Sequence, residues 1–152
     1  MTPDYVSRRV VMDRLEWVDR MVNQIQALPL ADRDAFFADS RNVWAAESCL
    51  RRALEALFDL GRHILAKGFG AGASEYKEIA TKLGEYNVLA PTDVELLRTL
   101  AGYRNRLVHF YHEVSPDELY NICHSNLGDL GRITQAYRAW VKANADRVDK
   151  NL

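Results

Sequence analysis

One stretch of the sequence, YRNRLVHFYHEV at residues 103–114, gathers side chains that handle charge and protons. It contains Arg104 and His109, five residues apart, followed closely by Tyr111. An arginine binds phosphate oxygens, and a histidine exchanges a proton near neutral pH. The pair suits RNA cleavage, in which a base removes the 2′-hydroxyl proton, that oxygen attacks the adjacent phosphorus, and an acid protonates the leaving oxygen.

The spacing of these residues decides how they can cooperate. At about 100° per residue, positions 104 and 111 are nearly eclipsed on a helix, whereas positions 104 and 109 lie about 140° apart. Arg104 and His109 could reach one substrate if the arginine stem curls around the helix. Alternatively, a second copy of the helix meets the first across a twofold axis, and the two copies share one cleft.

A purely structural role fits the same residues. Arg104 could pair with a carboxylate of a neighbouring helix, while His109 and Tyr111 could be partly buried with satisfied hydrogen bonds. Arg106 fits either a surface charge or a contact to RNA phosphate, and His112 fits either a solvated side chain or a further RNA contact. The residue types alone do not separate these alternatives.

Apolar residues recur at helical spacing along nearly the whole chain. We therefore expect an all-α fold, an antiparallel bundle of four principal helices plus one or two short ones. Residues 1–152 would form a single domain whose tail, residues 144–152, frays. The first helix is expected to begin at Pro3 after a Thr2 cap, and a short helix is expected over residues 30–38.

Capping patterns predict the remaining helix starts. A long helix is expected over about residues 41–67, and Ser74 is expected to cap the next one. The capping box from Thr92 to Glu95 opens the helix that runs into residues 103–114. A second capping box, Ser115-Pro116-Asp117-Glu118, opens a last long helix that extends to about Val141.

Composition excludes several classes of protein. The formal net charge of −1 and a pI near 6.4 argue against gripping nucleic acid by bulk charge, although a local basic cleft remains compatible. No apolar run approaches the roughly 20 residues of a membrane span, and we expect a cytoplasmic protein. Cys49 and Cys123 are expected to be free buried thiols, and no metal-ligand spacing or cofactor motif is present. The tryptophans are expected to be core or interface anchors.

The run R-N-R-L-V-H-F-Y resembles the R-x-x-x-x-H-x-Y signature of the HEPN superfamily, specifically its HepT-like toxin branch. The helix reading LLRTLAGYRNRLVHFY and the earlier segment LRRALEALFDLGRHIL are similar to helices of that branch. The resemblance covers roughly residues 6–137.

The resemblance implies a dimeric helical bundle that brings both motifs into one cleft and acts as a metal-independent endoribonuclease of a toxin–antitoxin system. By position, Arg104 and His109 would be the catalytic pair and Asn105 the polar residue that supports them. Tyr111 matches the tyrosine that a nucleotidyltransferase antitoxin, MntA, modifies with AMP to silence the toxin. Arg106 and His112 remain possible RNA contacts.

A second hypothesis keeps the same residues without catalysis. In it, the chain is a helical subunit that binds nucleotide or docks a nucleotidyltransferase, and Arg104 grips phosphate. A third is a purely structural helical dimer. Because binding and cleaving a phosphate use the same side chains, the sequence does not separate the first two.

Overall fold

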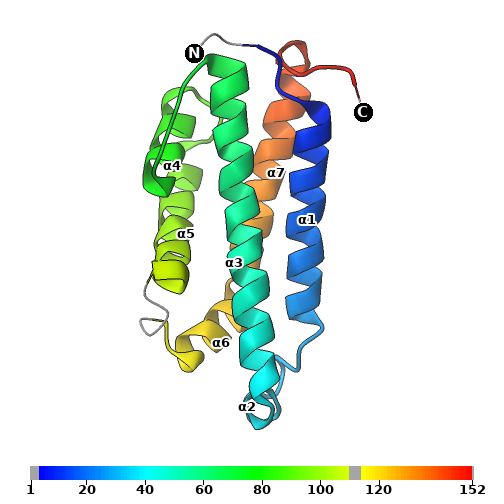
Figure 1. The fold of residues 1–152 in the computed structure, drawn as a ribbon, viewed down its shortest axis with the longest axis vertical. Helices are drawn as coiled ribbons and strands as arrows, with labels where there is room; N and C mark the ends of the chain where they lie inside the picture. Colours follow the sequence, from blue (N-terminus) through cyan, green and yellow to red (C-terminus); the bar gives the residue numbers. More distant parts are fainter. Residues whose placement is uncertain (1–3, 110–113, 152) are drawn as a thin grey trace.

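Four long helices form the body of the protein. The computed structural model describes residues 4–109 and 114–151, without the side chain of His109. The long helices alternate in direction, as expected for an antiparallel bundle, with α3 in the middle (Figure 1). They are α1 (Arg8–Gln26), α3 (Ser40–His63), α5 (Pro91–His109) and α7 (Leu127–Ala143).

Three shorter helices complete the bundle in the described part of the chain: α2 (Arg33–Ala38), α4 (Tyr76–Glu85) and α6 (Pro116–Ser125). A π-helical turn, η1 (Ile64–Gly68), continues α3, and a 3₁₀ turn, η2 (Ala145–Arg147), follows α7. Helix α4 lies beside α5, on the side of α3 opposite to α1 and α7 (Figure 1). The expected all-α bundle is confirmed.

The core forms where α3 meets its neighbours. Fully buried leucines recur along α3 at steps of three and four residues, because such steps return a helix to the same face. The hydroxyl group of Tyr137 on α7 donates a hydrogen bond to the carbonyl oxygen of Leu57, at 3.0 Å. A Cβ atom at Gly61 would lie only 2.8 Å from that hydroxyl oxygen, so the glycine allows α3 and α7 to approach this closely.

The first helix starts later than the Thr2–Pro3 cap predicts. Thr2 and Pro3 lie outside the described residues, and α1 begins at Arg8, with Ser7 as the N-cap that accepts a hydrogen bond from the amide of Val10. Val6 instead forms a β-bridge with Val148, and both are buried. Residues 144–149, expected to fray, thus pack against the start of the chain.

The last long helix is divided at Asn126 into α6 and α7, against the expectation of one continuous helix. The Ser115 cap is confirmed, since its hydroxyl oxygen accepts from the amide of Glu118 at 3.1 Å. The Thr92 cap is wrong because α5 already begins at Pro91. Ser74 is one residue too early to cap α4, whose N-cap is Glu75.

Other expectations concern cysteines and membranes. Both cysteines are free; Cys123 is buried, and burial raises the pKa of its thiol to about 12, whereas Cys49 is only half-buried. Within the described residues, every helix is too short or too polar to cross a lipid bilayer.

Candidate functional site

Arg104 sits on the inward side of α5. The helix buries Leu97, Leu100, Ala101 and Leu107, and position 104 falls three or four residues from three of them. Helical spacing therefore turns the arginine toward the bundle, and its side chain is only 17% exposed. Burying a charged guanidinium group this far from solvent is costly unless specific partners replace the lost water.

Two neighbouring helices supply those partners. The Nη2 atom of Arg104 lies 3.6 Å from a carboxylate oxygen of Glu55 on α3, and its guanidinium carbon lies 4.3 Å from the ring centroid of Tyr76 on α4. Tyr76 in turn stacks on Phe58, with ring centroids 4.7 Å apart. Glu55 also lies 3.6 Å from Arg51, so its charge is shared between two arginines.

The partners leave one donor of Arg104 unused. Its Nε atom is shielded from solvent and lacks a hydrogen-bond acceptor among the described residues. A buried unsatisfied donor costs about 1–3 kcal/mol, and more when the group is charged. The arrangement therefore holds the guanidinium in place with one buried donor left unsatisfied. The alternative that Arg104 pairs with a carboxylate of a neighbouring helix is also realised, through Glu55.

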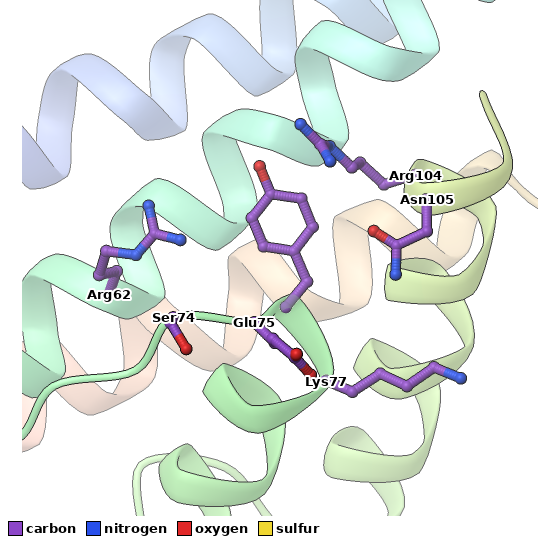
Figure 2. A pocket seen from close by; sticks show the side chains of 7 residues that line it. Arg62, Ser74, Glu75, Lys77, Arg104 and Asn105 are labelled. Atoms are coloured by element: carbon purple, nitrogen blue, oxygen red, sulfur yellow. The ribbon is translucent and has the colours of Figure 1, made fainter. Parts of the chain in front are cut away.

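A pocket of about 510 Å³ opens beside this arginine. Asn105 lines it next to Arg104, and its supporting role stays a prediction. Figure 2 shows α3 and α5 contributing opposite walls, with the start of α4 between them. Its lining is Arg62, Ser74, Glu75, Tyr76, Lys77, Arg104 and Asn105. Three cationic side chains face one carboxylate there, so the pocket favours an anion.

Arg106 has a different environment from Arg104. Its two terminal nitrogens lie 2.7 and 2.6 Å from the two carboxylate oxygens of Glu118 on α6. This fork-to-fork geometry is the strong form of an arginine–carboxylate pair. Arg106 thus joins α5 to α6, and the RNA contact considered for it stays a prediction.

Several predicted site residues fall where the structure describes little. His109 is the last residue of α5, in the expected helix, and its side chain is outside the described part of the chain. Tyr111 and His112 also lie outside the described residues. The expected roles of these three residues therefore remain predictions.

Sequence reasoning did not single out the residues that surround Arg104. Glu55, Tyr76, Arg62 and Lys77 come from α3 and α4, and no spacing along the chain connects them to position 104. Their side chains meet only because the bundle brings three helices together. Arginines and aromatic residues occur in most helices, so their presence in the sequence does not predict that they meet in the fold.

The tryptophans differ in their environments. Trp140 is buried and Trp17 is half-buried, as core anchors would be, but Trp44 is 67% exposed. Trp44 lines a pocket of about 340 Å³ together with Leu107 and Val114. Among the residues of the described ranges, no group of three or more His, Cys, Asp or Glu side chains is placed to hold a metal ion.

Comparisons with known proteins converge on one family. A model of the family described as ribonuclease HepT-like matches residues 18–137 of this chain. The chain is 25% identical over 111 residues to the tRNA nuclease HepT of Aphanizomenon flos-aquae, covering 73% of this chain and 76% of that protein. It is 28% identical over 125 residues to a putative RNase of Archaeoglobus fulgidus, covering 76% and 89%.

Solved structures agree on the fold. A tri-AMPylated HEPN toxin of Shewanella oneidensis, solved in complex with an MNT antitoxin, superposes with a TM-score of 0.77 at 22% identity. The superposition covers 86% of this chain and 97% of that one. At this level of identity, the similarity establishes the helical architecture.

Proposed function

Since the chain belongs to the HepT-like ribonuclease family, as the match over residues 18–137 shows, we propose that it is the toxin of a toxin–antitoxin pair. In this proposal it is an endoribonuclease that cuts RNA without a metal ion. The observation that carries the proposal is the largely buried Arg104 guanidinium, which lines a pocket together with two further cationic side chains, Arg62 and Lys77.

The proposed reaction needs one base, one acid and one stabilising cation. The imidazole of His109 takes the proton from the 2′-hydroxyl, and that oxygen forms a bond to the adjacent phosphorus. The bond from phosphorus to the 5′-oxygen breaks, and an acid protonates the departing oxygen. The products are a 2′,3′-cyclic phosphate and a 5′-hydroxyl, while Arg104 stabilises the negative charge that develops on the phosphate oxygens.

The active unit is proposed to be a homodimer. Positions 104 and 109 lie about 140° apart around one helix, so two copies would supply the arginine and the histidine to a shared cleft. Mixing two inactive variants, Arg104→Ala and His109→Ala, tests this. Heterodimers would contain one intact site and regain activity, whereas a site built within one chain would regain none.

Silencing is proposed to occur at Tyr111, by AMP transfer from a nucleotidyltransferase antitoxin. The Shewanella oneidensis HEPN toxin is tri-AMPylated in its complex with the MNT antitoxin, and this supports the same regulation here. Attached AMP would bring negative phosphate charge to the cleft and compete with RNA for Arg104. Co-expression with a neighbouring nucleotidyltransferase gene, followed by mass spectrometry, would show whole AMP units on the wild type and none on Tyr111→Phe.

The central experiment is an RNA cleavage assay in EDTA. Purified wild type, with Tyr111 shown to be unmodified, is incubated with total tRNA and with mRNA, since a relative is named as a tRNA nuclease. We expect new fragments that end in 2′,3′-cyclic phosphate with the wild type and none with Arg104→Ala or His109→Ala. Intact RNA in every lane would favour the alternative, a non-catalytic subunit that binds nucleotide or docks the nucleotidyltransferase.

A further inference from the structure

The pocket beside Arg104 carries two further cations that the proposed reaction does not use. Arg62 projects from the last turn of α3, and Lys77 from the first turn of α4 (Figure 2). Both line the same pocket as Arg104 and Asn105. They come from separate helices and lie on opposite sides of Ser74 and Glu75, with the Lys77 side chain pointing away from Arg62 (Figure 2).

Arg62 is held in position while remaining accessible. Its Nε atom donates to the carbonyl oxygen of Ala73 at 3.3 Å, and its guanidinium carbon lies 5.9 Å from the centroid of the Tyr76 ring. The nearest carboxylate oxygen, on Asp59, is 3.8 Å away, which is too long for a strong pair. The side chain is still 42% exposed, so a ligand in the pocket can reach it.

Lys77 adds a charge that its surroundings do not neutralise. Its ammonium group forms no ion pair with the residues that the structure describes, whereas Lys82 on the same helix pairs with Glu78 at 3.2 Å. The local field there favours an anion even though the whole chain is nearly neutral.

The aromatic ring in the pocket already has several close neighbours. Phe58 stacks on Tyr76 with ring centroids 4.7 Å apart, and the guanidinium carbon of Arg104 lies 4.3 Å from the same centroid. The guanidinium carbon of Arg62 lies 5.9 Å from it. A nucleobase would have to displace one of these groups to stack on the ring, so the pocket suits the sugar–phosphate backbone of RNA better than a base.

We propose that Arg62 and Lys77 bind two different backbone phosphates of the RNA strand, one on each side of the linkage that is cleaved beside Arg104. This inference rests on the proposed ribonuclease function and names two substrate-binding residues for it. The two cations act on binding and not on chemistry, because each contacts a phosphate that does not react. Their loss should therefore raise KM and leave kcat nearly unchanged.

The test compares two substrates cut by the same protein. One is an oligoribonucleotide that spans a mapped cleavage site, and the other is the dinucleotide with the scissile linkage as its only phosphodiester. Arg62→Gln and Lys77→Gln should each raise KM about five-fold on the long substrate, from the loss of one partly exposed contact to a charged group. On the dinucleotide, both variants should match the wild type.

The chain offers matched controls on the far side of the bundle. Arg138→Gln removes an arginine whose side chain is 39% exposed and pairs with Asp19, close to the 42% of Arg62. Lys142→Gln removes an exposed lysine at the end of α7. Both controls should keep the KM of the wild type on either substrate. Circular dichroism and urea unfolding establish that each variant is folded.

The outcomes separate this inference from the proposed function. Equal KM values for the pocket variants and the controls on long RNA would overturn the phosphate site while the nuclease stands. A rise in KM on the dinucleotide as well would also overturn the phosphate site, because the variants would then be disturbing Arg104.

If the wild type cuts no RNA, the proposed function fails, and RNA binding measured by fluorescence anisotropy still tests the site. Loss of one contact should then reduce the slope of log affinity against log salt by about 0.7.

Discussion

The contact between Tyr76 and Arg104 makes a sharp prediction about activity. If the tyrosine ring holds the guanidinium in its catalytic position, Tyr76→Leu should lower the rate of RNA cleavage, whereas Tyr76→Phe should preserve it. Phenylalanine keeps the aromatic face below Arg104 and the stack on Phe58, while leucine removes both. Tyr76 then acts through Arg104 and is a positioning residue.

The structure sets the size of the effect. Cation–π contacts contribute about 0.5–1 kcal/mol at exposed sites and about 2 kcal/mol when they are desolvated. Arg104 is only 17% exposed and lies 4.3 Å from the ring centroid, which places this contact near the upper value. About 2 kcal/mol corresponds to a loss of up to about 30-fold in kcat. KM should change much less, because the guanidinium is proposed to act mainly on the charge of the transition state.

The assay is steady-state cleavage of an oligoribonucleotide by wild type, Tyr76→Leu and Tyr76→Phe, with unfolding in urea as the control for stability. Full activity in Tyr76→Leu would show that the ring does not position Arg104. Equal losses in both variants would point to the hydroxyl group instead of the aromatic face. If Tyr76→Leu lowers the free energy of unfolding and leaves kcat unchanged, the role of Tyr76 is packing alone.

Three further predictions concern the surrounding structure. A double-mutant cycle with Arg106→Gln and Glu118→Gln should give a coupling of about 1 kcal/mol in urea unfolding, and RNA affinity should stay unchanged; a weakened affinity at constant stability would make Arg106 an RNA contact. Burial lowers the pKa of His63, whose Nε2 accepts from the amide of Ser7 at 2.9 Å. The unfolded chain therefore binds the extra proton first, so the free energy of unfolding should fall as pH drops below about 6.5, and His63→Gln should flatten that dependence. Gly61→Ala would place a Cβ atom 2.8–3.0 Å from three buried side-chain atoms, so it should lower stability by about 1–2 kcal/mol in urea unfolding despite a better helix propensity; unchanged stability would mean that the neighbours move aside freely.

Helices and their inner faces could be predicted because they depend on local spacing. The Ser115 cap was correct, since a serine side chain bonds to an amide three residues away and needs no distant partner. The Thr2–Pro3 start was wrong although its local pattern is equally good. There, Val6 forms a bridge with Val148, and the amide of Asp4 donates to the carbonyl oxygen of Lys67, so contacts with distant parts of the chain decide where α1 begins.

The cluster around Arg104 could not be predicted for a related reason. Glu55, Tyr76 and Arg62 reach the arginine from helices separated from it by long stretches of chain, and only the packing of the bundle defines their distances. The division at Asn126 was also hidden, because apolar spacing continues from Cys123 through Leu127 without a glycine or proline. The spacing of apolar residues predicts which face of a helix is buried, but it does not show where one helix ends and the next begins in a new direction.

The pairing of the two chain ends has a practical consequence. Asp149 donates its amide to the carbonyl oxygen of Val6 and accepts from the amide of Arg8 at 3.0 Å, so the first and last described segments run side by side. Both ends lie at the opposite end of the bundle from α6 and from the end of α5 (Figure 1). A short linker could therefore close the chain into a ring or anchor it to a surface, with the end of the molecule that carries residues 103–109 left facing the solution.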